Sequence, residues 1–356
     1  MIRIETELNI LPANNGDSIL IKTYDKNRNE VIILIDGGTP TTFKYSLKKH
    51  LKEIAKIDLL VLTHIDNDHI GGLKNFFKNG LIEKIEIGEI WYNQPDAEFY
   101  ESRSEKAIIS VPQAEDWKAL IKEKKNGVAI KEITTENRII NIKDLEFTIL
   151  SPTSEIINKL YKAWLKKRNK PIEKAIKSQI SICKPSFSKS LEELNKIDFK
   201  PEKSIDNDIY NSSSIAFLLR CPDLSLLLLA DSRAEVIIDN LKNMDYSEST
   251  PVEVDFVKVS HHGSLNNTSQ DLLSLIKSNN YIISTNGGTS KHKHPSRETI
   301  ARIVCKKNRN DDILNIYTNY SLDRIKLRIG EFIADEDLKN GNWNIEHKNT
   351  FTKNDL

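Results

Sequence analysis

Four side chains that can bind a metal ion crowd into six residues of the stretch "VLTHIDNDHIGG", Val61 to Gly72. They are His64, Asp66, Asp68 and His69. Imidazoles and carboxylates packed this closely at a chain reversal repel one another, or shift their pKa values, unless a cation lies among them. The stretch therefore predicts a cation site whose remaining ligands come from elsewhere in the chain.

A second pair of strand ends supplies the candidate partners. In the first half of the chain an apolar strand ends at Asp36, a helix follows, and the next apolar strand ends at His64, 28 residues later. In the second half the same pattern ends at Asp231 and at His261, 30 residues later. Functional groups gather at the carboxyl ends of strands in α/β sheets. We therefore expect all four strand ends to face one cleft.

The spacing of the first cluster favours two ions over one. Ligands at positions i, i+2, i+4 and i+5 of a turn cannot easily face one ion, but alternating pairs can face two. His64 and Asp66 are predicted to bind one divalent cation, and Asp68 and His69 the other. Asp231 is the natural bridge, because a shared carboxylate holds two metals ~3.5–4 Å apart in such sites.

Two adjacent histidines in the second half compete for the remaining coordination position. His261 ends its strand directly and is predicted to be the ligand. His262 is expected to point elsewhere.

Taken together, these motifs resemble the metallo-β-lactamase fold superfamily, whose H-x-[HD]-x-D-H-x-G-G motif is present from His64 to Gly72. They are more narrowly similar to the ComEC-like metallohydrolase branch, which also has an aspartate at the second motif position. Further shared motifs follow in chain order: "GDSILI" (Gly16–Ile21), "IDGG" (Ile35–Gly38), N-x-x-S at Asn211 and Ser214, "HHGS" (His261–Ser264) and "HP" (His294–Pro295).

The resemblance implies an α+β protein, a four-layer αββα sandwich with a di-metal centre at one edge. It also implies hydrolysis by a hydroxide bound to two divalent metal ions, Zn²⁺ or Mn²⁺. Asp66 makes the site richer in oxygen, so Fe²⁺ and Mg²⁺ are further candidates. The chain has no histidine between His69 and His261, where many superfamily members carry one more ligand. Asn211, a carboxylate such as Asp208, or water is expected there.

Catalytic roles follow from the same resemblance. Asp68 is expected to act in catalysis as well as in metal binding, and Asp36 to orient a ligand or a water molecule. The alternative for Asp36 is that it caps the following helix. His262 or His294 is expected to protonate the leaving alkoxide or to contact a phosphoryl oxygen. A solvated loop is the alternative for the segment around His294.

The composition is that of a globular protein. Of 356 residues, 38% are hydrophobic and 29% charged, and the net charge is +1. The longest apolar runs fall short of the roughly 18 residues that cross a bilayer, and the N-terminus has no signal-peptide pattern. We expect a cytoplasmic protein without membrane insertion. The three cysteines form no C-x-x-C and are predicted to be reduced.

The pattern along the chain alternates strands and helices, with one interruption. Over residues 155–206 the strand pattern disappears, and "SEIINKLYKAWLKKRNK" and "PIEKAIKSQISI" predict basic amphipathic helices. We predict a hydrolase domain over residues 1–330 that carries this helical insertion, followed by a C-terminal tail over residues 331–356. Alternating apolar residues in "RIKLRI" predict a last strand.

The insertion is strongly basic. Residues 155–203 hold 13 lysines and arginines against 6 acidic residues, an excess of +7. A basic segment near a dication cleft attracts polyanions, so we expect substrate contacts at Lys166, Lys167 and Arg168. The alternatives are a solvated helix face and a surface, residues 155–203, that binds a protein partner.

These features favour a metal-dependent phosphodiesterase or nuclease with a phosphodiester or nucleic-acid substrate. One alternative is a hydrolase of a carboxylic or phosphocholine ester, a thioester or a lactone, since the same nucleophile attacks carbonyl groups. The second alternative is an effector or scaffold protein with a structural metal site. The sequence makes no prediction of the oligomeric state.

Overall fold

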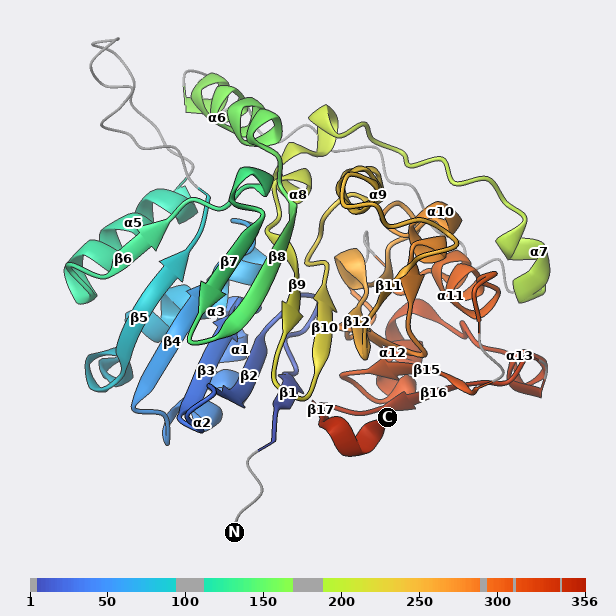
Figure 1. The fold of residues 1–356 in the computed structure, drawn as a ribbon, viewed down its shortest axis with the longest axis horizontal. Coiled ribbons are helices and arrows are strands. Elements are labelled where there is room, and N and C mark those ends of the chain that lie inside the picture. The colour runs from blue at the N-terminus through green and yellow to red at the C-terminus, as the bar shows by residue number, and fades with distance from the viewer. Residues whose placement is uncertain (1–4, 94–111, 169–187, 289–292, 310–311, 340) are drawn as a thin grey trace.

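Two β-sheets packed face to face form the centre of the molecule (Figure 1). The computed structural model describes residues 5–93, 112–168, 188–288, 293–309, 312–339 and 341–356. The first sheet has the strand order β17 (Thr350–Phe351), β1 (Glu7–Ile10), β2 (Ile19–Tyr24), β3 (Glu30–Ile35), β4 (Lys56–Val61), β5 (Glu86–Trp91) and β6 (Ala129–Lys131).

The second sheet is built mainly from the C-terminal half of the chain. Its order is β16 (Trp343–His347), β15 (Leu314–Thr318), β14 (Asn280–Ile283), β12 (Phe256–Lys258), β10 (Ser225–Leu228), β9 (Ala216–Arg220), β8 (Leu145–Ser151) and β7 (Ile139–Ile142). A separate pair joins β11 (Val252–Glu253) and β13 (Ile276–Lys277).

Helices cover the outer faces of both sheets. On the first sheet they are α1 (Pro40–Thr42), a π-helical turn (Phe43–Leu47), α2 (Lys48–Leu51), α3 (Asn67–Phe77) and α5 (Pro112–Lys124). On the second they are α7 (Leu191–Asn195), α9 (Ala234–Lys242), α10 (Gln270–Ser274), α11 (Arg297–Val304) and α12 (Leu322–Ile329), with α13 (Asp335–Lys339) following.

Three buried clusters define the layers. One cluster lies between the sheets, where Phe147 and Phe217 of the second sheet pack with Trp91 of the first. The other two lie between each sheet and its helices. The strands alternate their apolar residues toward these two interfaces, which leaves both faces of each sheet buried. The predicted αββα sandwich is confirmed.

The two halves place their strand ends in matching positions. β3 and β4 are parallel neighbours, and so are β10 and β12. The backbone N–H of Asp36 donates to Val61 (2.9 Å), and that of His261 donates to Ala230 (2.9 Å). In Figure 1 the β7–β8 and β9–β10 hairpin turns lie at the lower end of the molecule, so β8 and β10 run upward.

Two helices of the predicted insertion region lie at this upper end, α6 (Ser154–Arg168) and α8 (Ile209–Ser212) (Figure 1). They pack on each other through Ile156, Ile157, Leu160 and Ile209. The second predicted helix of the insertion, residues 171–182, lies outside the described residues. None of the described helices combines the length and the hydropathy that a membrane span requires.

The predicted strand at Arg324–Ile329 is wrong, because this segment forms helix α12. Ile325 and Ile329, one helical turn apart, are buried, whereas Leu327 between them is 87% exposed. The alternation of apolar residues is typical of a strand, but only two of the three apolar side chains face the core.

The segment 331–356, predicted as a tail, contributes β16 to the second sheet and β17 to the first. Its apolar residues Trp343 and Phe351 are buried. This segment thus joins both sheets at their edges.

The glycines of the metal-binding motif let helix α3 approach the end of strand β3. A Cβ added to Gly72 would lie 1.8 Å from the carbonyl oxygen of Gly37. Across this contact the N–H of Gly72 donates to Gly38 (2.9 Å), and the N–H of Gly37 donates to His69 (2.8 Å). The contact therefore fixes the helix turn that carries Asp68 and His69.

Gly72→Ala should destabilise the protein by about 1–3 kcal/mol or more, because the added methyl group must push α3 off β3. Gly80→Ala is the matched control, since nothing lies within 4 Å of its Cβ position, and its change should stay within about 0.5 kcal/mol. Urea unfolding of both variants measures the difference. Equal stability of the two would show that the contact is loose.

Candidate metal centre

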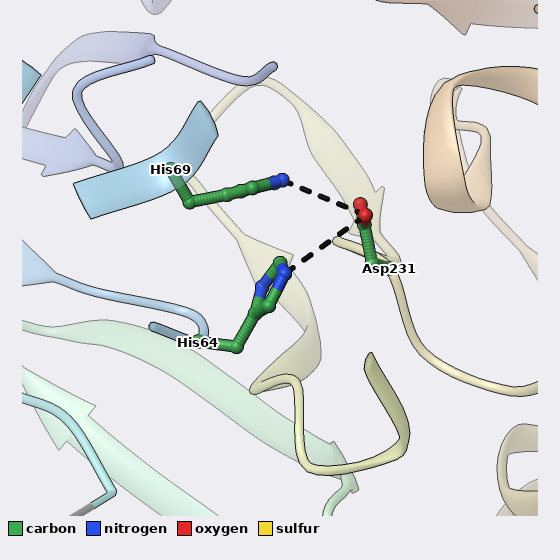
Figure 2. A group of neighbouring side chains, drawn as sticks. All are labelled: His64, His69 and Asp231. Carbon is green, nitrogen blue, oxygen red and sulfur yellow. Dashed lines mark ion pairs between the residues drawn. The ribbon is translucent and has the colours of Figure 1, made fainter. Parts of the chain in front are cut away.

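The carboxylate of Asp231 lies at the centre of the strand ends and faces four imidazoles. Its Oδ2 atom is 3.5 Å from Nε2 of His69, 3.5 Å from His262, 3.7 Å from His261 and 4.0 Å from His64. Figure 2 shows His64, from the loop after β4, and His69, from α3, both pointing at Asp231 in the loop after β10. The structure thus brings the predicted ligands of the two halves together.

The Nδ1 atoms of two of these imidazoles donate hydrogen bonds away from the centre. His69 Nδ1 donates to Oδ2 of Asp36 (2.7 Å), which also accepts from the hydroxyl of Thr63. His262 Nδ1 donates to the carbonyl oxygen of Ser284 (3.0 Å). Because a carboxylate and a carbonyl only accept, both Nδ1 atoms carry a proton. The carboxylate of Asp36 therefore holds the ring of His69, and its role in orienting a metal ligand stays a prediction.

The other two imidazoles are held in the same way. Thr63 gives its only hydroxyl proton to Asp36, so it accepts from His64 Nδ1 at 3.1 Å. His261 Nδ1 donates to Oδ1 of Asn267 (3.2 Å), whose amide group donates to the backbone around Asp231. In their neutral forms all four imidazoles therefore direct an Nε2 lone pair toward Asp231.

Most of these Nε2 atoms accept no hydrogen bond from the described part of the chain. The Nε2 atoms of His64, His69 and His262 are buried without a hydrogen-bond partner there, and so is Oδ1 of Asp231. Buried polar atoms nearly always have a partner. Imidazole nitrogens and carboxylate oxygens suit divalent transition metals, so this donor set fits a metal centre.

Among the described residues the candidate ligands form four overlapping groups, of which two contain Asp17, one with Asp36 and His69 and the other with Asp231 and His262. The remaining two combine residues that the sequence singled out. In one, ligand atoms of His64, His69 and Asp231 lie within 4.8 Å of one another, and in the other, those of Asp68, His69 and His262 do so. His69 belongs to both groups. The two groups are compatible with the predicted pair of ions.

The charges of the cluster shift its titration strongly. Burial lowers the pKa of His64 to about 4, and the neighbouring His69 adds to the effect. Burial also lowers the pKa of His69, but the carboxylates of Asp231 and Asp36 outweigh it and raise that pKa well above its usual value. Burial raises the pKa of Asp231, but His262, His261 and His69 hold it well below its usual range.

The two remaining carboxylates of the motif lie toward the open side. Oδ2 of Asp66 is 3.9 Å from His64 Nε2, and its side chain is 47% exposed. Oδ2 of Asp68 accepts from the amide of Asn15 (2.7 Å). Asn15 lies in the turn between β1 and β2, so this contact ties the motif to its own sheet.

Left-handed backbone recurs at the strand ends. Ten described residues other than glycine have positive φ, and four of them lie at these strand ends: Asp36 (56°), Ala230 (45°), His261 (46°) and His262 (55°). Such conformations cost about 1–3 kcal/mol each and cluster at functional sites. Two of them in succession turn the chain so that both neighbouring imidazoles face Asp231. The expectation that His262 points elsewhere is therefore wrong.

His294 lies at the edge of the cluster. Its ring centroid is 5.5 Å from that of His261, which is itself partly exposed. This position suits the predicted contact with a substrate, and the role stays a prediction.

Asn211 and Asp208, which were predicted to replace the histidine ligand that this chain lacks, form a hydrogen bond with each other. Asn211 donates to Oδ1 of Asp208 (3.0 Å), and Oδ2 of Asp208 lies 3.5 Å from the guanidinium of Arg233. Asp208 is therefore paired with a cation of its own. Oδ1 of Asn211 is buried without a hydrogen-bond partner in the described residues, and its predicted role is still open to test.

The basic insertion begins beside the metal-binding motif. Lys166, Lys167 and Arg168 lie in the last turn of α6, and their side chains are outside the described part. One turn earlier, Trp164 packs on Ile65, which stands between His64 and Asp66, and on Tyr210. Helix α6 therefore contacts the motif directly.

Sequence reasoning missed three residues that hold these ligands. Thr63 and Asn267 orient imidazoles, as described above. Oδ1 of Asp17 lies 3.5 Å from Nδ1 of His262. The available signal for Asp17 was a carboxylate directly before the buried strand of "GDSILI".

Comparison with known proteins agrees with this geometry. A family model described as the metallo-beta-lactamase superfamily matches residues 11–140. The chain resembles this superfamily over these 130 of its 356 residues, which include the cluster from His64 to His69. It is also 22% identical over 350 residues to ComE operon protein 3 of Bacillus subtilis (strain 168), a match that confirms the ComEC-like resemblance. That match covers 92% of this chain and 34% of the relative, so the chain spans about a third of that protein's length.

Solved structures of similar overall layout are only distantly alike. A "new diphosphatase from the PhnP family" is 10% identical, with a TM-score of 0.41 and 97% of each chain covered. Zn²⁺-bound PqqB from Methylobacterium extorquens is 9% identical, with a TM-score of 0.39, 93% of this chain and 86% of that chain covered. Scores this low support no inference about function. The superfamily match itself implies a hydrolase with divalent metal ligands.

Metal binding should release a proton from His69. Its pKa, raised well above the usual value by Asp231 and Asp36, favours the protonated imidazole in metal-free protein, and an ion at Nε2 displaces that proton. The apparent affinity for Mn²⁺ should therefore rise about tenfold per pH unit for one proton released. Competition with a chromophoric chelator at about pH 6 and about pH 7 measures this slope.

His347→Gln is the control for that slope, because this exposed histidine lies outside the cluster. It should keep the wild-type dependence. A wild-type affinity that does not change with pH would contradict metal binding at His69.

Proposed function

We propose that this chain is a metal-dependent phosphodiesterase that cleaves nucleic acid. The observation that carries the proposal is the convergence of four imidazole Nε2 atoms on Asp231, beside the two further carboxylates Asp66 and Asp68. Such a mixed nitrogen and oxygen donor set suits two divalent cations.

Each ion would take ligands from both halves of the molecule. His64 and Asp66 would hold one ion, and Asp68 and His69 the other, with Asp231 between them. His262 joins the second group by its geometry, and His261 lies at the more exposed side. Bound there, two cations supply Lewis-acid polarisation of a phosphoryl oxygen and a water nucleophile at neutral pH.

The chain's own residues supply orientation and proton transfer. Asp36, Thr63 and Asn267 fix the imidazole rings, so the ligand geometry exists before substrate arrives. His294, next to His261 at the edge of the cluster, is the proposed proton donor to the leaving alkoxide. Since the imidazole of His262 faces Asp231, we assign it to metal binding in preference to proton transfer.

The preference for a nucleic-acid substrate rests on charge and position. The basic segment, with its excess of +7 over residues 155–203, begins on a helix that packs on the metal-binding motif through Trp164 and Ile65. A positive segment beside a dication cleft attracts polyanions and gives salt-dependent binding. A neutral ester would gain nothing from it.

Asp231→Asn should lower Mn²⁺-dependent cleavage of DNA, RNA and bis(p-nitrophenyl) phosphate by more than about 100-fold. Loss of residues that merely orient ligands already costs 10–100-fold, and Asp231 faces every imidazole. The measurement pairs metal analysis of the purified protein with initial rates. Asp58→Asn is the control, since this buried aspartate accepts a hydrogen bond at the other end of the sheet, and it should keep activity within about threefold.

Protein shown to be loaded with Mn²⁺, Zn²⁺, Fe²⁺ or Mg²⁺ that turns over no phosphodiester would reject the proposal. Turnover of neutral esters, thioesters or lactones alone would assign the site to that other class of hydrolase. Unchanged biological activity of Asp231→Asn would favour an effector with a structural metal.

Reversing the charge of Lys166, Lys167 and Arg168 to glutamate should slow cleavage of nucleic acid and spare bis(p-nitrophenyl) phosphate. Each lost phosphate contact lowers the slope of log affinity against log salt by about one. The same reversal at Lys44, Lys49 and Lys52, exposed residues on or near α2 at the opposite end of the molecule, should leave both substrates unaffected. Equal losses from the two triple variants would exclude a specific role for α6.

A further inference from the structure

A buried ion pair lies directly beneath the imidazole cluster. Asp17 precedes β2 in the first sheet, and Lys258 ends β12 in the second. Their side chains are 2% and 0% exposed, and the ammonium of Lys258 donates to Oδ2 of Asp17. A buried ion pair is seldom a net source of stability, because both ions lose their hydration. Its place beside the site points to a different role.

The pair contacts the segments that carry the candidate ligands of the second half. Lys258 Nζ also donates to the carbonyl oxygen of Ala230 (3.3 Å), the residue before Asp231. Oδ1 of Asp17 lies 3.5 Å from Nδ1 of His262 and has no hydrogen-bond partner among the described residues. The pair thus reaches both the loop of Asp231 and the ring of His262.

The pair also joins the two sheets. Asp17 follows Gly16, whose Cα packs on the backbone of Asp68 so tightly that a Cβ there would lie 1.7 Å from the Asp68 carbonyl oxygen. Asp17 is therefore fixed relative to the first-half ligands, while Lys258 belongs to the strand that leads into His261 and His262. The distance between the two ligand sets depends on this link.

We propose that Asp17 and Lys258 are a positioning pair, which sets the affinity of the centre for divalent cations by holding Asp231 and His262 against His69. This inference rests on the proposed metal-dependent function and deepens it.

Both charges are needed for that role. A lone ammonium beneath the centre would repel divalent cations, and a lone buried carboxylate would be costly or would turn toward them. Paired, the two groups are neutral together, and the ammonium still connects three segments. The carboxylate beside Nδ1 of His262 favours the tautomer whose Nε2 faces Asp231.

Asp17→Asn should lower the affinity for Mn²⁺ by about 10–100-fold, the usual effect of losing a carboxylate that orients a ligand. Competition with a chromophoric chelator gives the affinity, and thermal unfolding with and without Mn²⁺ gives a second readout. The rise in Tm caused by saturating Mn²⁺ should be smaller in the variant than in wild type.

Asp337→Asn is the matched control. Asp337 forms a buried ion pair with Arg297, between α13 and α11. It should lower Tm while keeping Mn²⁺ affinity within about twofold. An affinity loss as large as that of Asp17→Asn would reduce the role of Asp17 to general stability and overturn the proposal.

The double variant Asp17→Asn with Lys258→Met removes both charges and leaves no unpaired ion in the interior, which protects its folding. Its Mn²⁺ affinity should still be at least about tenfold below wild type, because the support of His262 and the Ala230 loop is gone. Wild-type affinity in this variant would overturn the positioning role and leave the proposed function intact. Wild-type protein that binds neither Mn²⁺ nor Zn²⁺ would overturn the proposed function itself.

Discussion

Mutual repulsion among buried groups is the constraint on which this structure depends. Four imidazole nitrogens and several carboxylates share one volume around Asp231, and the Nδ1 atom of every imidazole is already committed to a neighbour. Their Nε2 lone pairs cannot turn away. Protonation of His69 offsets part of the negative charge, yet it leaves buried polar atoms without partners. Divalent cations would satisfy all of them at once.

The fold meets this constraint by repetition. In each half a parallel strand pair ends in an aspartate and a histidine. A backbone hydrogen bond joins the two strand ends, from the N–H of Asp36 to Val61 in the first half and from the N–H of His261 to Ala230 in the second. Glycine contacts let α3 reach the end of β3, and left-handed residues turn the second-half imidazoles inward. The local strain concentrates where the side chains converge, at positions that the surrounding sheets hold firmly.

Strand ends were predictable from the sequence because they follow from apolar runs and chain order. Asp36, His64, Asp231 and His261 meet for that reason. The direction of His262 was not predictable, because a positive φ in a residue other than glycine leaves no mark in the sequence. Asp17 was missed because its partner Lys258 is 241 positions away. The helix at Arg324–Ile329 was mistaken for a strand because three apolar residues alternate there. Only the structure shows that the middle one, Leu327, is exposed to solvent and does not belong to the buried face.

The most direct measurement of the central claim is anomalous X-ray scattering at the manganese edge from crystals of the Mn²⁺-loaded protein. We expect two peaks ~3.5–4 Å apart, with the carboxylate of Asp231 between them and imidazoles from both halves around them. Peaks only at surface carboxylates, or no peak near Asp231 with excess Mn²⁺, would contradict it.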